Sequence, residues 1–165
     1  MPAITALLHT ANDALRMGRT LETLLPCAEF LIIDHHSADA THRIAREYGA
    51  RIIAADGDTV GSEYLDLARH DWIFCISPGE SMTEGLQASL FEWAALPAYE
   101  VAGGVAGGRP FSVCVREQVR KNWLDLPFPE TRLIPRTWAR WQGQLPAPEP
   151  SAIPLEGDLL RFALP

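Results

Sequence analysis

The chain has 165 residues, of which 47% are apolar and 21% are charged, and its formal charge at pH 7 is −7. This length and composition predict one globular domain with a core of ordinary size. The negative charge argues against a nucleic-acid partner, because Lys and Arg supply most of the binding to a phosphate backbone.

Short apolar runs alternate with helical patterns through the first half of the chain. Strands are predicted at residues 4–8, 30–33, 51–54 and 72–76. Helical patterns follow the first two of these runs, a short helix is expected at residues 63–68, and a further helix follows the fourth run. This β-α-β-α-β order with short connections predicts a parallel sheet with right-handed crossovers.

Polar residues mark where two of these helices begin. Ser37 or Asp39 can cap the second helix, which Gly49 ends. Ser81 and Glu84 form a capping-box pattern ahead of the last helix of this half.

The second half of the chain has a different pattern. Strand-like runs occur at residues 99–101, 111–115 and 132–134, and residues 138–141 hold two tryptophans. Four prolines between residues 146 and 154 predict an extended strap before the final apolar run. The Gly-rich stretch at residues 103–108 lacks the ending of a P-loop, so a flexible connection is the better interpretation.

One strand ends in an acid and a later one does not. The run FLIIDHHSADAT at residues 30–41 places Asp34 at the end of its strand, ahead of a polar turn and a helix. In α/β proteins this arrangement presents a carboxylate to a ligand beyond the carboxyl end of the strand. The run DWIFCISPGE at residues 71–80 carries Ser77 where a second acid would be expected.

These segments together resemble the family-2 glycosyltransferases of the GT-A fold, in particular the branch that decorates lipopolysaccharide cores and other surface glycans. The similarity covers most of the chain and is strongest in the first hundred residues. The pieces that carry it are TAND at residues 10–13, DHHSADAT at 34–41, DWIFCISPGE at 71–80, RLIPR at 132–136 and ARWQG at 139–143.

The resemblance implies a three-layer α/β/α, Rossmann-like sandwich with a mostly parallel central sheet. It also implies a nucleotide-binding half at residues 1–96, an acceptor-side portion at 97–145 and an extended tail at 146–165. In that family the first loop and the acid after the second strand hold the nucleotide, commonly the uridine of a UDP-sugar.

The resemblance therefore assigns substrate contacts to Thr10, Asn12, Asp34 and Ser77, and a catalytic role to Glu80. Because these residues follow strands of one parallel sheet, Thr10, Asn12, Asp34 and Glu80 are expected to line one cleft. A carboxylate only accepts hydrogen bonds, so it suits the N–H and hydroxyl donors of a nucleoside. The alternative is that Asp34 only caps a turn.

The chain departs from the family at its metal site. Family members hold a divalent cation on an Asp-x-Asp motif, because Mg²⁺ and Mn²⁺ prefer oxygen ligands and neutralise the leaving diphosphate. Here those positions are Ser77 and Gly79, and only Glu80 remains beside them. No resident cofactor is expected, and Mg²⁺ or Mn²⁺ would bind only weakly, together with a nucleotide diphosphate. The basic-Asn pair of the family is replaced by Gly61 and Ser62.

Two functions from different classes stay open. One is a small transferase that moves a sugar from a UDP-type donor with weak or no metal-dependent activity. The other is a non-catalytic binding or regulatory module that acts through a partner protein. His9 could lie near a phosphate or in a turn, and His35 and His36 are better explained as solvated loop residues than as metal ligands.

Cysteine usage and hydropathy bear on the location of the protein. Cys27, Cys75 and Cys114 lie far apart and show no zinc-binding spacing, which favours a reduced setting. No run approaches the ~18 apolar residues of a membrane span. We therefore expect a cytoplasmic protein without a transmembrane segment, and either a homo-oligomer or a protein partner is compatible with the sequence.

Overall fold

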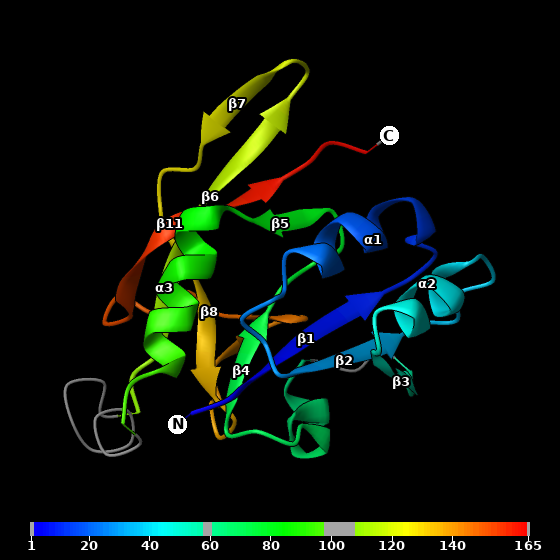
Figure 1. Cartoon of the computed structure of the whole chain (residues 1–165), viewed down its shortest axis with the longest axis horizontal. Helices are drawn as coiled ribbons and strands as arrows, with labels where there is room; N and C mark the ends of the chain where they lie inside the picture. The colour runs from blue at the N-terminus through cyan, green and yellow to red at the C-terminus, as the bar shows by residue number, and fades with distance from the viewer. Residues whose placement is uncertain (1, 58–60, 98–107, 165) are drawn as a thin grey trace.

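A computed structural model of the chain describes residues 2–57, 61–97 and 108–164 (Figure 1). In chain order its elements are β1 (Ile4–Thr10), α1 (Ala14–Glu22), β2 (Glu29–Asp34), α2 (Thr41–Glu47), β3 (Arg51–Ala54), the 3₁₀ helix η1 (Gly61–Leu67), β4 (Trp72–Cys75), β5 (Glu80–Met82), α3 (Glu84–Ala94), β6 (Phe111–Val119), β7 (Asn122–Asp125), β8 (Glu130–Pro135), β9 (Trp141–Gln142), β10 (Leu145–Pro146) and β11 (Ile153–Arg161). Nine strands form one sheet in the order β3-β2-β1-β4-β8-β6-β11-β5, with β7 paired to β6, while β9 and β10 pair separately.

The first half of the sheet is parallel, as the alternating pattern predicted. β1 lies between β2 and β4, and β3 pairs with the far side of β2. The register places Thr10 opposite Asp34 at the carboxyl ends of β1 and β2. The expected α/β class is therefore confirmed.

The second half of the sheet is mixed. β8 pairs antiparallel with β4 and β6, and β5 pairs antiparallel with β11, whereas β6 and β11 run parallel. The expectation of a mostly parallel sheet thus holds only for the first four strands of the sheet order. The antiparallel part arises because β8 lies beside β4 in the opposite direction and β6 pairs with the other side of β8.

The two faces of the sheet are covered differently. Side chains of β1 alternate, so Ala6 and Leu8 join a core with α1, α2 and α3, while Leu7 points into a second core. That second core is closed by Tyr64 and Leu65 of η1. The helices α1, α2 and α3 therefore cover one face, and on the other face the outer layer is a 3₁₀ helix together with the segment around β9 and β10.

The proline-rich tail is part of the main sheet. β11 inserts between β6 and β5, and its register shifts between Pro154 and Asp158. Proline cannot donate to a strand ladder, so this irregularity lets the tail enter a central position. Figure 1 shows β11 as the last coloured strand beside β6, with the C-terminus emerging next to α1.

One local expectation, the cap of α3, is wrong, and others concern residues that the structure does not describe. Helix α3 is capped by Thr83, whose Oγ1 accepts a hydrogen bond from the N–H of Leu86, while Ser81 lies in the short strand β5. The predicted strand at residues 99–101 and nearly all of the Gly-rich stretch lie outside the described residues. Within the described part of the chain, no helix is both long enough and apolar enough to cross a bilayer.

Candidate functional site

A cleft of about 550 Å³ opens at the carboxyl ends of β1, β2 and β4. This edge of the parallel strands is where α/β sheets commonly place ligands. Thr10 and Ser77, two of the predicted contact residues, lie on its wall. The full lining consists of His9, Thr10, Ala11, Asp13, Arg16, His35, Ser77, Pro78 and Gln144.

Two histidines pair at the base of this cleft. Nδ1 of His9 lies 2.9 Å from Nε2 of His35, and His9 also meets the ring of Tyr64 edge-on. The other nitrogen of His9, Nε2, is buried and has no hydrogen-bond partner among the described residues. Burial first, and the neighbouring His35 second, lower the pKa of His9 to about 4. His9 is therefore a neutral imidazole at pH 7.

Asp34 lies at the end of β2, opposite Thr10 in the register, but it is not among the residues that line the cleft, so the expectation that it shares this cleft with Thr10 is not confirmed. Its Oδ2 accepts hydrogen bonds from the backbone N–H of Ser37 at 3.1 Å and from Nε2 of His42 at 2.6 Å. Burial alone would raise the pKa of Asp34, but these hydrogen bonds hold it below its usual range, so the carboxylate is charged. Its second oxygen, Oδ1, is buried without a hydrogen-bond partner in the described structure. An unsatisfied buried carboxylate oxygen is costly unless something else donates to it.

Asn12 connects the two loops above the sheet. It has a positive φ of 55°, its Oδ1 accepts from the N–H of Ala38 at 2.7 Å, and its own N–H donates to Ser37 Oγ at 2.9 Å. The side chain is thus used to join the loop after β1 to the loop after β2. Asn12 does not line the cleft, so the structure gives it a positioning role for the loop that carries Thr10.

Thr10 and Asp13 form the wall next to α1. The Thr10 hydroxyl and the Ala11 N–H both donate to Asp13 Oδ2, at 2.7 and 3.0 Å. Arg16, in the first turn of α1, forms an ion pair with the other oxygen of Asp13 and faces the cleft. This guanidinium brings positive charge to the cleft beside Ser77 and Pro78.

Glu80 lies outside the cleft, in a buried ion-pair cluster. Arg132 binds both of its oxygens at 2.7 and 2.8 Å, and Arg161 Nη2 lies 3.0 Å from Oε2. The Ser77 N–H donates to Oε1 at 2.8 Å, and Arg132 also reaches the carbonyl of Cys75. Glu80 and Arg132 have side chains that are 1% and 0% exposed.

The electrostatics of Glu80 follow from this burial. Burial would raise the pKa of its carboxyl, but the Arg132 guanidinium and the hydrogen bonds keep the pKa below its usual range. The carboxylate thus holds β5, β8 and β11 together through its two arginines. The expectation that Glu80 shares the cleft with Thr10 is wrong, because its buried carboxylate is bound by Arg132 and Arg161 and does not line the cleft. Its catalytic role stays a prediction that this geometry does not support.

The loop after β4 does not fit a divalent cation. Mg²⁺ and Mn²⁺ need several oxygen ligands, and proteins supply these mainly as carboxylates. Ser77 and Gly79 bring none, and both oxygens of Glu80 are bound by guanidinium groups. In residues 2–57, 61–97 and 108–164, no group of three or more His, Cys, Asp or Glu side chains is arranged to hold a metal ion.

Among the polar residues that line the cleft, Asp13, Arg16 and Gln144 had no role in the sequence-based prediction. Arg16 had a usable signal, because a basic residue in the first turn after β1 starts close to the carboxyl edge of the sheet. Gln144 had no such signal, because the turn between β9 and β10 brings it there from the far end of the chain.

No protein-family model and no curated protein sequence matches the chain. Solved structures resemble it in fold: residues 1–349 of S. aureus TarS match with a TM-score of 0.55 and 13% identity, over 81% of this chain and 47% of that one. Glucosyl-3-phosphoglycerate synthase from Mycobacterium tuberculosis matches with a TM-score of 0.46 and 15% identity, over 73% of this chain and 45% of that one. The chain therefore spans less than half the length of either structure. TarS has the GT-A fold of the glycosyltransferases, and the likeness to it shows that this chain has the same fold.

Proposed function

We propose that the chain is a glycosyltransferase family-2-like scaffold that binds a UDP-type nucleotide sugar in the cleft at the ends of β1, β2 and β4. The observation that carries this proposal is the cleft itself, which Thr10, Ser77 and the Arg16 guanidinium line together. Asp34 is charged and stands opposite Thr10 in the sheet register, and its buried Oδ1 lacks a partner among the described residues, so a uracil N–H or a ribose hydroxyl that reached this oxygen would satisfy it. The GT-A fold also supports the proposal, because the glycosyltransferase family that the sequence motifs resemble has this fold and binds its nucleotide at this edge of the sheet.

The Arg16 side chain supplies a positive charge that can bind the diphosphate of the nucleotide. Arg16 faces the cleft beside Ser77 and Pro78, and a guanidinium binds phosphate oxygens through paired N–H donors. Because the loop after β4 does not fit Mg²⁺ or Mn²⁺, we assign the diphosphate contact to Arg16. Nucleotide binding should then need no added metal, and metal-dependent sugar transfer should be weak or absent.

The alternative is a non-catalytic binding or regulatory module that acts through a partner protein. The position of Glu80 favours it, because the only acid left from the family motif is bound by Arg132 and Arg161. In this alternative the cleft binds nucleotide but does not turn it over. Release of UDP from UDP-glucose separates the two functions.

Calorimetric titration tests the binding proposal. UDP and UDP-glucose should bind more tightly than ADP, and their affinities should be the same in EDTA as in Mn²⁺. Asp34→Asn should weaken UDP binding about tenfold, which corresponds to about 1.4 kcal/mol. Asp66→Asn, an exposed acid in η1, is the matched control and should bind UDP like the unchanged protein.

Two results would contradict the proposal. One is the absence of UDP binding at millimolar concentration by a folded protein. The other is Mn²⁺-stimulated release of UDP that EDTA abolishes, which would identify a working metal site and refute the assignment of the diphosphate contact to Arg16.

A further inference from the structure

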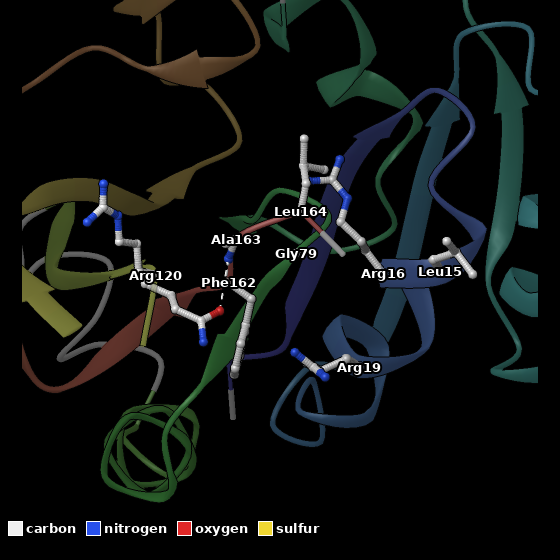
Figure 2. A pocket seen from close by; sticks show the side chains of 9 residues that line it. Leu15, Arg16, Arg19, Gly79, Arg120, Phe162, Ala163 and Leu164 are labelled. Carbon is white, nitrogen blue, oxygen red and sulfur yellow. Dashed lines mark hydrogen bonds between the residues drawn. The ribbon is translucent and has the colours of Figure 1, made fainter. Parts of the chain in front are cut away.

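A second cavity lies on the other side of Arg16. It has a volume of about 470 Å³ and is bounded by α1, by the turn between β6 and β7, and by the residues after β11. Figure 2 shows Arg16 and Arg19 on one side, Arg120 on the opposite side, and Phe162, Ala163 and Leu164 between them. The N–H of Ala163 donates to Gln118 Oε1 at 3.2 Å, which fixes the segment after β11 against β6.

The lining of this cavity is cationic although the chain is acidic. Among the described residues that line it, three are arginines and none is Asp or Glu. Arg16 pairs with Asp13, but within the described residues neither the Arg19 nor the Arg120 guanidinium bonds a carboxylate. Grouping cations around one cavity is unfavourable by Coulomb repulsion unless an anion joins them. The cavity is therefore complementary to a negatively charged group.

Apolar side chains lie beside these cations. The Arg19 guanidinium rests 4.2 Å from the centre of the Phe162 ring, which leaves its N–H edge available. Leu15 and Leu164 are 86% and 74% exposed at the same cavity. Large hydrophobic side chains that are this exposed beside a cationic cavity match a ligand with a charged end and an apolar body.

We propose that this second cavity binds a small, soluble phosphate monoester with an apolar carbon body. Its phosphate, carrying close to two negative charges at pH 7, would neutralise Arg19 and Arg120, which a single carboxylate would not. Its carbon body would lie on Phe162, Leu15 and Leu164. The ligand would reach the nucleotide cleft at Arg16, which lines both cavities.

The relation to the nucleotide rests on the proposed function, whereas the binding of the phosphate monoester does not. If both ligands bind, they contact opposite sides of one guanidinium, so the cavity is where the second substrate, or a regulator, of the nucleotide site would lie. Binding of hexyl phosphate without UDP binding would refute the proposed function and leave this site standing.

Titration with hexyl phosphate, inorganic phosphate and hexanoate tests the site. Hexyl phosphate should bind at least tenfold more tightly than either of the other two, because only it offers both a dianion and an apolar body. The double variant Arg19→Gln/Arg120→Gln should lose at least tenfold in affinity for hexyl phosphate and bind UDP unchanged. Arg46→Gln, an exposed arginine on α2, is the matched control and should change neither affinity.

Arg16→Gln should weaken both UDP and hexyl phosphate, and Leu15→Ser should weaken only hexyl phosphate. Equal binding of hexyl phosphate by the unchanged protein and by a folded double variant would overturn the proposal. So would equal affinity for hexanoate and hexyl phosphate. Binding to phosphatidic acid vesicles without binding of hexyl phosphate would also overturn it, because the ligand would then be a membrane surface.

Discussion

Arg16 lies across Gly79, and a Cβ built on Gly79 would come within 3.2 Å of Arg16 Nη1 and 3.3 Å of its Cδ. In the family resemblance drawn from the sequence, Gly79 stands at the position of the second acid of the Asp-x-Asp motif. The arginine therefore fills space that a side chain at residue 79 would need. The position of Arg16 beside the cleft thus depends on residue 79 having no side chain.

Gly79→Ala should displace Arg16 as well as strain the backbone. Gly79 has a φ of +89°, so any side chain there costs about 1–2 kcal/mol of stability from conformation alone. Gly49→Ala has a similar φ of +75° with nothing within 4 Å of the added Cβ, so it isolates the strain. Both variants should lose stability in urea, but only Gly79→Ala should also weaken UDP binding. Equal UDP affinities in the two variants would show that Arg16 does not depend on Gly79.

Restoring acids to the loop after β4 should not restore a metal site by itself. In Ser77→Asp/Gly79→Asp, the new carboxylate at residue 79 would lie against the Arg16 guanidinium and pair with it. We expect Mn²⁺ affinity to rise only when Arg16→Gln is added, as measured by calorimetry without nucleotide. A rise in Mn²⁺ affinity of the double variant equal to that of the triple variant would show that the arginine does not compete with the metal.

Arg132→Met should destabilise the protein by about 3–5 kcal/mol, because it leaves the buried Glu80 carboxylate without its main partner. Urea unfolding followed by tryptophan fluorescence measures this change. Arg116→Met removes the partner of Asp125 in an exposed ion pair and should cost less than about 1 kcal/mol. Similar losses in the two variants would mean that the Glu80 cluster contributes no more than a surface pair.

The parallel half of the fold could be predicted because its information is local. Short continuous apolar runs predicted β1, β2 and β4, and the short helical connections between them predicted their parallel direction. Once those strands are parallel, Thr10 and Asp34 must meet at one edge, as they do. The edge of the sheet that holds the cleft was therefore predictable from sequence, but Thr10 and Ser77 line the cleft whereas Asn12, Asp34 and Glu80 do not.

The rest depends on contacts between distant segments. Arg132 stands at the start of an apolar run, where a charged residue is usually exposed at the end of a strand. Its partner Glu80 lies 52 positions earlier in the chain. The orientation of Glu80 is set by its place in β5, a three-residue strand that pairs with the proline-containing tail. Neither β5 nor β11 has a sequence pattern that identifies its partner strand, so the position of Glu80 outside the cleft could not be predicted.

His9 makes the stability of the protein depend on pH. Its pKa is lowered from 6.5 to about 4 by burial and by His35, so the unfolded chain takes up a proton on His9 that the folded protein excludes. Stability from this group is therefore complete above pH 6.5 and falls as the pH decreases toward 4. The difference between the two pKa values corresponds to about 3 kcal/mol.

His9→Gln should remove most of this dependence, because glutamine stays neutral at every pH while it can still hydrogen-bond to His35. The free energy of unfolding, measured in urea at pH 7.5, 6.0 and 4.5, should decrease for the unchanged protein, and this decrease should be about 2–3 kcal/mol smaller for the variant. His36→Asn changes an exposed histidine whose positive φ asparagine tolerates, so it should follow the unchanged protein. If His9→Gln and His36→Asn lose stability in parallel as the pH falls, the buried imidazole at the end of β1 is not the group that titrates.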